Sequence, residues 1–165
     1  MAQAASIAAG KVVALLTDSL AGLAPVAAQI AANAGVDLPA ISAENVIPQN
    51  ASVALMEKSS AVKYPVVLVY SDRVQNLLIE KFRNFSGKVR TVAEVRASQD
   101  RIEGLEDRVR LYVDAVTQVL DANRGDWGHG MFFTGGYEVK FDPVQHGGRN
   151  VLQVAKVIFE VDLSS

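Results

Sequence analysis

The residues that could do acid–base or metal chemistry are few in this sequence. His129 lies in a glycine-rich stretch close to Asp126, and His146 follows Asp142. A histidine beside a carboxylate is a common pair for proton transfer and for binding a divalent metal ion. The spacing matches no recognised metal motif, so we favour two solvated loop histidines over a metal site or an acid–base pair.

Other catalytic patterns are missing from the sequence. The chain has no cysteine, which excludes disulfides, thiolate metal sites and cysteine nucleophiles. The pair Gly135-Gly136 lacks the lysine and the spacing of a phosphate-binding loop and instead indicates a bend or bulge in a strand. No serine lies in a nucleophile-elbow sequence. These patterns predict no cofactor and no metal site.

Residues that could bind another protein are easier to find. Trp127 lies among glycines, where a large aromatic side chain either fills the edge of a core or anchors a protein contact. Residues 71–87 are a candidate loop or arm that reaches a neighbouring molecule. The candidate contact residues are Arg73, Lys81, Phe82, Arg83, Phe85, Lys88 and Trp127.

The charge is unevenly distributed along the chain. Residues 72–96 contain 6 basic and 3 acidic side chains, a net of +3, whereas residues 97–162 contain 7 basic and 11 acidic ones, a net of −4. A molecule with opposite patches can assemble head to tail, and such a contact closes into a ring when its rotation permits. The alternative is an ordinary mixed surface.

The composition sets the class of protein. The 165 residues are 50% hydrophobic and fit one domain, 1–165, with a sizeable core. The net charge of −2 argues against a dedicated nucleic-acid-binding protein. Residues 1–55 are rich in alanine and poor in charge, and residues 56–165 carry the stronger core pattern.

The alanine-rich region has a helical pattern. We expect two amphipathic helices divided near Pro25, which suits the first position of the second one. The expected buried face is Ala9, Val13, Leu16, Leu20, Leu23, Ala27 and Ile30. Alanine is too weakly apolar to drive membrane insertion, and Asp18 closes the only apolar run that resembles a signal peptide. We expect neither a membrane span nor a targeting signal, an irregular connection over 34–52, and a short strand from Ala51 to Glu57.

The second region alternates between strand and helix patterns. Residues 65–70 are a continuous apolar run rich in β-branched residues, as in a strand buried on both faces. Within residues 89–97, the odd-numbered positions from Val89 to Ala97 alternate with Arg90, Val92, Glu94 and Arg96. This alternation predicts a strand with one largely polar face. A helix with an apolar stripe from Ile102 to Leu120 should begin after Ser98 or Asp100.

Two more strands should follow this helix. They are expected over residues 133–141 and 151–161, with a loop over 142–150 between them. The order predicts an α+β fold in which helices pack on one face of a mainly antiparallel sheet, preceded by an alanine-rich helical region.

This order of elements resembles the lambda-type tail terminator family of long-tailed bacteriophages. The resemblance covers roughly residues 60–163 and rests on the strand Tyr64-Pro-Val-Val-Leu-Val-Tyr70, the strand Gly87–Arg96, the long helix and the final strand Asn150–Val161. It implies a structural protein without an active site. It also implies a ring, commonly a hexamer, at the head-proximal end of the tail tube.

The same resemblance implies the partners and the location. A tail terminator stops polymerisation of the tube and contacts the tail tube protein and the neck or connector proteins. The protein would be assembled in the host cytoplasm and would reside at the tail–neck junction of the virion. The genome would pass through the ring without sequence-specific recognition. The alternatives are a head-closure or tail-completion protein, and, less favoured, a ligand-binding module that uses the Trp127 loop or a small enzyme that uses His129 and His146.

Overall fold

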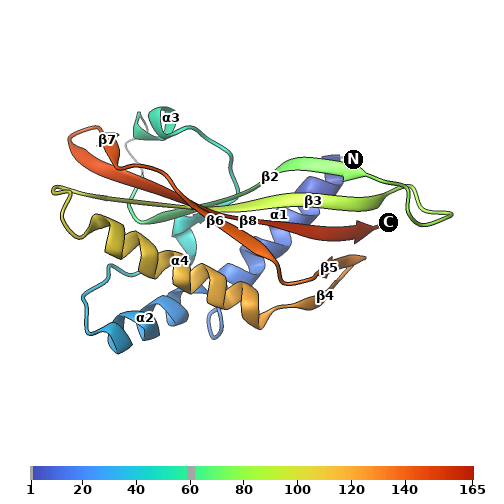
Figure 1. Ribbon diagram of the computed structural model, residues 1–165, viewed down its shortest axis with the longest axis horizontal. Coiled ribbons are helices and arrows are strands. Elements are labelled where there is room, and N and C mark those ends of the chain that lie inside the picture. Colours follow the sequence, from blue (N-terminus) through green and yellow to red (C-terminus); the bar gives the residue numbers. More distant parts are fainter. Residues whose placement is uncertain (1, 59–61) are drawn as a thin grey trace.

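A long, curled β-sheet runs along the molecule and carries its helices (Figure 1). The structure is a computed structural model that describes residues 2–58 and 62–165. Within these residues the helices are α1 (Ala2–Leu16), α2 (Leu23–Ala34), α3 (Val53–Glu57) and α4 (Leu105–Ala122), with a 3₁₀ turn at Ala43–Asn45. The strands are β1 (Val46–Ile47), β2 (Val66–Asn76), β3 (Ser86–Gln99), β4 (Gly125–Gly128), β5 (Met131–Phe133), β6 (Tyr137–Phe141), β7 (Gln145–Gly147) and β8 (Asn150–Ser164).

Strand β8 is the centre of the sheet. One of its edges pairs with β3 along its length, from Gln99 opposite Val151 to Ser86 opposite Ser164. Its other edge pairs in turn with β7, β6 and β5. Strand β2 pairs with β3, and every pairing among the described residues is antiparallel except the short contact of β1 with β2. The prediction of an α+β fold with a mainly antiparallel sheet is confirmed.

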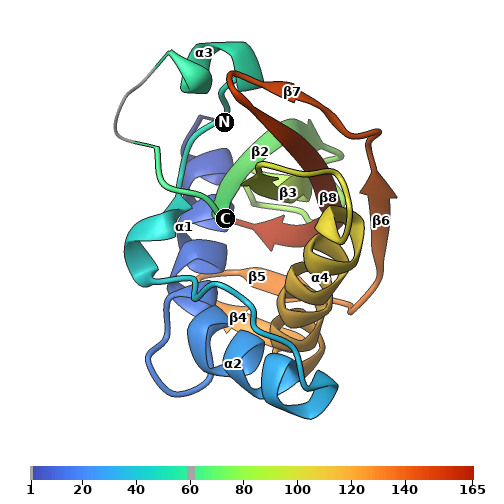
Figure 2. The same cartoon turned by 90° about the vertical axis from the view of Figure 1, so that its left-hand side faces the viewer.

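The main core lies between one face of this sheet and two helices. Alternate residues of β3 and β8 point to this face, as expected from the period of two in a strand. They include Val89, Ala93, Val95, Ala155, Val157, Phe159 and Val161. Helices α1 and α4 pack against them, and α2 packs on α4 as an outer layer (Figure 2).

Helix α3 departs from the expected arrangement in two ways. The segment from Ala51 to Glu57 was expected to be a strand, but it forms this short helix because the Ser52 hydroxyl accepts a hydrogen bond from the Leu55 N–H and so caps its first turn. Met56 of α3 then covers Val66 on the opposite face of the sheet from α1 and α4. The helices therefore do not all lie on one face.

The N-terminal helices are shifted relative to the expected pattern. Buried residues of α1 recur every four positions at Ala4, Ala8, Val12 and Leu16, whereas Leu20 lies beyond the helix and is exposed. The small side chains let α1 approach the sheet closely. Helix α2 begins at Leu23, so Pro25 lies within its first turn rather than at its start. Among the described residues, no helix is long and apolar enough to cross a membrane.

Helix α4 is shorter than predicted. Strand β3 continues to Gln99, because the Ser98 hydroxyl donates a hydrogen bond to the Val151 carbonyl instead of capping a helix. The helix begins at Leu105 after Gly104, whose φ of 77° is unfavourable for other residues. Ile102 therefore lies outside the helix and is exposed.

The region after α4 confirms one expectation and refines another. The chain bends at Gly135-Gly136, where the predicted strand over 133–141 divides into β5 and β6. The predicted loop over 142–150 contains the short strand β7, which pairs with the beginning of β8.

Candidate interaction site

Strands β2 and β3 form a hairpin that extends to one end of the molecule (Figure 1). Because β2 continues to Asn76 and β3 begins at Ser86, the loop between them is shorter than the arm expected over residues 71–87. We call residues 77–85 the arm tip. Of the predicted contact residues, Lys81, Phe82 and Arg83 lie in the exposed part of the arm tip.

The arm tip exposes a cluster of large apolar side chains. Leu78 and Ile79 are 64% and 70% exposed, Phe82 is fully exposed, and Leu77 is 42% exposed. Single exposed apolar residues are common on protein surfaces, but several within one short loop mark a contact site. The sequence drew attention to the aromatic residues here, but not to Leu78 or Ile79.

Hydrogen bonds hold the arm tip in one conformation. The Asn76 side-chain oxygen accepts hydrogen bonds from the backbone N–H groups of Leu78 (3.2 Å) and Ser86 (3.1 Å), and its amide nitrogen donates to the Asn84 carbonyl (3.1 Å). The Ser165 carbonyl accepts a hydrogen bond from the Asn84 N–H at 2.9 Å. The loop is thus bonded both to its own hairpin and to the segment that follows β8.

Two apolar residues of the arm tip have unfavourable backbone angles. Leu78 has a φ of 48° and Phe82 a φ of 65°, in the left-handed region that bulky residues rarely adopt. Each such residue costs about 1–3 kcal/mol, and strain of this kind collects at functional sites. Here it accompanies side chains that point into solvent, where they contribute nothing to the core.

Two predicted contact residues belong to the core instead. Phe85 is 5% exposed and Trp127 is 7% exposed. The Trp127 ring lies 5.3 Å from the Phe133 ring, measured between centroids, and its N–H donates to the Asn123 carbonyl at 2.6 Å. Trp127 therefore fills the edge of the core, the first of its two expected roles, and we remove both residues from the candidate contact surface.

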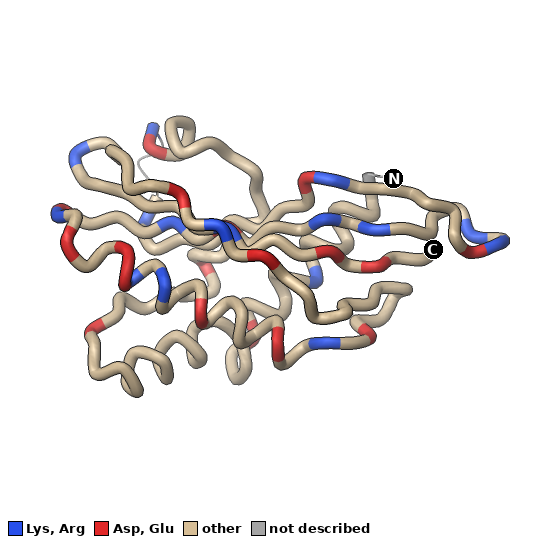
Figure 3. Tube along the Cα trace, in the orientation of Figure 1, with Lys and Arg blue, Asp and Glu red and all other residues tan. Residues whose placement is uncertain are grey.

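The charged segments do not form two separate patches. Strand β3 lies between β2 and β8, so its basic residues lie next to acidic residues of the neighbouring strands, as the blue and red segments of the chain trace indicate (Figure 3). The Lys88 ammonium lies 3.4 Å from a Glu160 carboxylate oxygen and 3.5 Å from one of Asp162, and these carboxylates, Asp162 foremost, raise the pKa of Lys88. Arg90 pairs with Asp72 at 3.2 Å. These ion pairs within one chain favour the alternative of an ordinary mixed surface over two opposite patches.

Three of the predicted basic residues remain on the arm besides Lys88. Arg83 pairs with Glu80 at 3.6 Å, and both are more than half exposed. Arg73 and Lys81 are exposed and have no ion pair among the described residues. Two basic side chains of the hairpin are therefore free of ion pairs among the described residues: Lys81 in the arm tip and Arg73 in β2.

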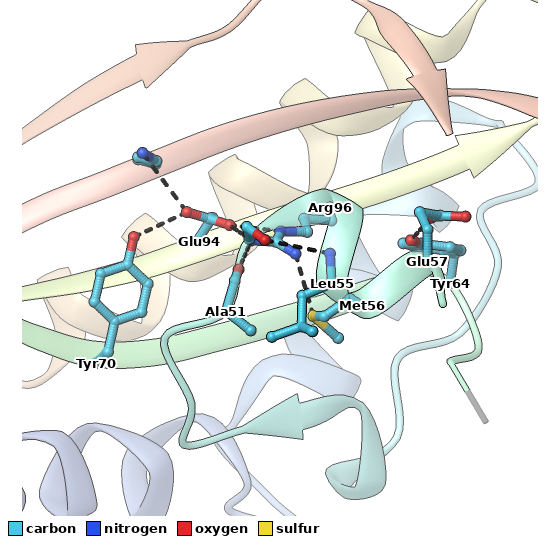
Figure 4. A network of polar contacts seen from close by, with 10 residues as sticks. Ala51, Leu55, Met56, Glu57, Tyr64, Tyr70, Glu94 and Arg96 are labelled. Atoms are coloured by element: carbon cyan, nitrogen blue, oxygen red, sulfur yellow. Dashed lines mark hydrogen bonds and ion pairs between the residues drawn. The ribbon is translucent and has the colours of Figure 1, made fainter. Parts of the chain in front are cut away.

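A buried ion pair lies at the other end of β3 (Figure 4). Glu94 and Arg96 are 4% and 3% exposed, and the Arg96 guanidinium contacts the Glu94 carboxylate. The same guanidinium donates to the Ala51 carbonyl and lies 3.1 Å from the Met56 sulfur. Arg96 thus joins the sheet to the segment that contains α3.

This cluster was not predicted from the sequence, because the alternation of β3 is typical of a strand with a solvated polar face. Glu94 and Arg96 do share the polar face of β3, but the 51–57 segment covers them. Two further groups contact Glu94: the Tyr70 hydroxyl donates to it at 2.8 Å, and the Lys156 ammonium lies 3.7 Å away. The available signal was the placement of two opposite charges, Glu94 and Arg96, at neighbouring positions on one face of the strand.

Buried tyrosines should make the protein sensitive to alkali. Burial raises the pKa of Tyr70 and of Tyr112, and the hydrogen bond of Tyr70 to Glu94 adds to this effect. Above the ordinary pKa of about 10, the unfolded chain releases these protons while the folded chain retains them. We therefore expect the urea midpoint to fall as the pH rises above about 10. The double variant Tyr70→Phe, Tyr112→Phe should show a smaller fall, and an equal fall would contradict this explanation.

A hollow of about 780 Å³ lies beside α3. We call it the α3 hollow. Its apolar lining comes from the α3 region, from β1 and from the beginning of β2, and its polar lining is mainly at the rim. The apolar residues are Ile47, Ala51, Leu55, Met56, Val62 and Val66, and the polar ones are Ser42, Glu44, Asn45, Gln49 and Lys63.

The two histidines lie far apart. His146 is in β7, opposite Val151 at the beginning of β8. His129 is in the turn before β5, and β5 pairs with β8 near its other end, at Leu163. Both are exposed. In residues 2–58 and 62–165, no group of three or more histidines and carboxylates could hold a metal ion.

No family model matches this chain, and no curated protein matches it either. The arm tip is the candidate contact surface, since its large apolar side chains are exposed.

Proposed function

We propose that the protein is the tail terminator of a long-tailed bacteriophage, a ring-forming subunit at the head-proximal end of the tail tube. The single observation that supports this most is the arm tip, where Leu78, Ile79 and Phe82 are exposed in a conformation fixed by hydrogen bonds. A structural ring protein needs such a surface, because its subunits must recognise one another or the tube. The order of helices and strands supports the same proposal by resemblance.

A ring explains how one small chain could stop tube growth. Lateral contacts between copies are used up when the ring closes, and two different faces remain. One face would bind the tail tube protein and the other the neck proteins. The central opening would let the genome pass.

The contacts between subunits should depend on apolar surface more than on charge. Most of the charged side chains of the hairpin pair within the chain and at its surface, where salt screens them. Assembly should therefore change little as the salt concentration rises. A steep loss of assembly with salt would instead indicate charged contacts.

Light scattering after size-exclusion chromatography tests the proposal directly. We expect a population with the mass of several subunits, and electron microscopy of that fraction should show rings with a central opening. Added tail tubes from the same virion should bind these rings at one end only. A monomer at every accessible concentration, with no binding to tubes, would contradict the proposal.

A further inference from the structure

We propose that the arm tip of one copy inserts into the α3 hollow of the next copy. This inference rests on the proposed ring function, since it assigns the contact between neighbouring subunits. The occupant of the hollow is thus a second copy of this chain, and its anchor is Phe82.

The two surfaces match in chemistry. The arm tip presents Leu78, Ile79 and Phe82, and the hollow is lined by apolar side chains that include the 61%-exposed Leu55. Its volume of about 780 Å³ lies within the roughly 300–1,000 Å³ that is usual for pockets that hold a ligand. An aromatic side chain in an apolar pocket is the typical anchor of a protein interface.

The charges beside the two surfaces are also compatible. Lys81 in the arm tip and Glu44 at the rim of the hollow are both exposed, and neither has an ion pair among the described residues. Lys63 shares the rim, so the hollow is not strongly acidic. The pairing of Lys81 with Glu44 would therefore orient the two subunits, while the apolar contact would supply most of the attraction between them.

The placement of the two surfaces favours a contact between copies. The arm tip joins β3 at Ser86, whereas Arg96, which contacts Met56 of α3, lies ten residues further along the same strand. That length of strand spans roughly 33 Å. Figure 1 shows α3 and the arm tip in opposite halves of the long axis. A tip cannot reach its own hollow, and a tip-to-hollow contact is heterologous, the type that can close a ring.

Cysteine crosslinking tests the contact without background, because the chain has no cysteine of its own. Two variants of the full chain, Phe82→Cys and Leu55→Cys, would be mixed and oxidised under mild conditions. We expect a disulfide-linked dimer in the mixture and little in either variant alone. A matched control replaces Phe82→Cys with Leu20→Cys, which changes an apolar residue that is 88% exposed elsewhere on the molecule.

The outcomes separate this inference from the proposed function. Rings in the microscope without crosslinks above the Leu20→Cys control would overturn the inference and leave the ring function standing. Crosslinks between Phe82→Cys and itself would also overturn it, because they indicate a tip-to-tip contact. Specific Phe82–Leu55 crosslinks without closed rings would support the contact and contradict the ring function.

A second variant tests the anchor itself. Asparagine tolerates the left-handed backbone at this position, so Phe82→Asn removes the aromatic ring without loosening the loop. We expect subunit association to weaken about 30-fold, as for an interface hot spot, with no fall in the unfolding temperature of the monomer, because asparagine relieves backbone strain at this position. Leu20→Asn should leave association unchanged. If Phe82→Asn associated with itself as strongly as Leu20→Asn and the unaltered protein do, Phe82 would not be the anchor.

Discussion

Replacing Arg96 with methionine should lower the free energy of unfolding by about 3–5 kcal/mol, the usual cost of removing one partner of a buried ion pair. The substitution keeps most of the length of the side chain but removes the guanidinium that pairs with Glu94. The Glu94 side chain, which is 4% exposed, would then be a buried charge without this partner. Of the described residues that contact this carboxylate, the Tyr70 hydroxyl and the more distant Lys156 would remain. The Ala51 carbonyl would also lose its donor, so α3 should detach more readily.

Two control variants make this prediction specific. Adding Glu94→Gln to Arg96→Met removes the stranded charge and should restore a large part of the lost stability. Lys88→Met breaks exposed ion pairs on the same strand and should cost less than about 1 kcal/mol. Urea denaturation of Arg96→Met, of the double variant and of Lys88→Met gives the free energy of unfolding of each for comparison with the unaltered protein. If Arg96→Met were no more destabilising than Lys88→Met, the cluster would not be sealed from water.

Trp127→Ala should be similarly destabilising, with a loss of about 3–5 kcal/mol, because it empties a large part of the core edge. Trp127 packs on the Phe133 ring, which in turn lies 5.5 Å from the Phe159 ring. The Asn123 carbonyl, at the C-terminal end of α4, also loses the hydrogen bond that it accepts from the indole N–H. The end of α4 should therefore fray together with β4 and β5.

Phe132→Ala is the matched control for this substitution. Phe132 is the neighbour of Phe133 in β5, but its side chain points outwards and is 48% exposed. Its replacement should change the free energy of unfolding much less than Trp127→Ala does. A stable Trp127→Ala monomer that no longer assembled would instead assign Trp127 to a protein contact.

The fold was predictable where hydrophobic periodicity is strong. Strands β3 and β8 and the body of α4 follow their sequence patterns closely, since each buries one regular face. Boundaries were less predictable, because they depend on single interactions. The Ser98 hydroxyl bonds to β8 rather than capping α4, and the Ser52 hydroxyl turns an expected strand into α3.

The candidate site was predictable only in part. A loop between two strands with Phe82 at its tip could be proposed from the sequence, but the burial of Phe85 and Trp127 depends on which strands become neighbours. The charge totals of 72–96 and 97–162 were correct and yet misleading. They describe segments along the chain, whereas β3 and β8 bring opposite charges side by side.

The continuous pairing of β3 with β8 has a mechanical consequence for the proposed assembly. The arm tip is attached at Ser86 and the Arg96 guanidinium contacts α3, so both attachment points are on β3. Tension between them loads the covalent backbone of β3, and the hydrogen bonds to β8, which are perpendicular to the strands, keep that backbone extended. Force between neighbouring subunits of the proposed ring would therefore pass along a strand that is already extended and can lengthen little.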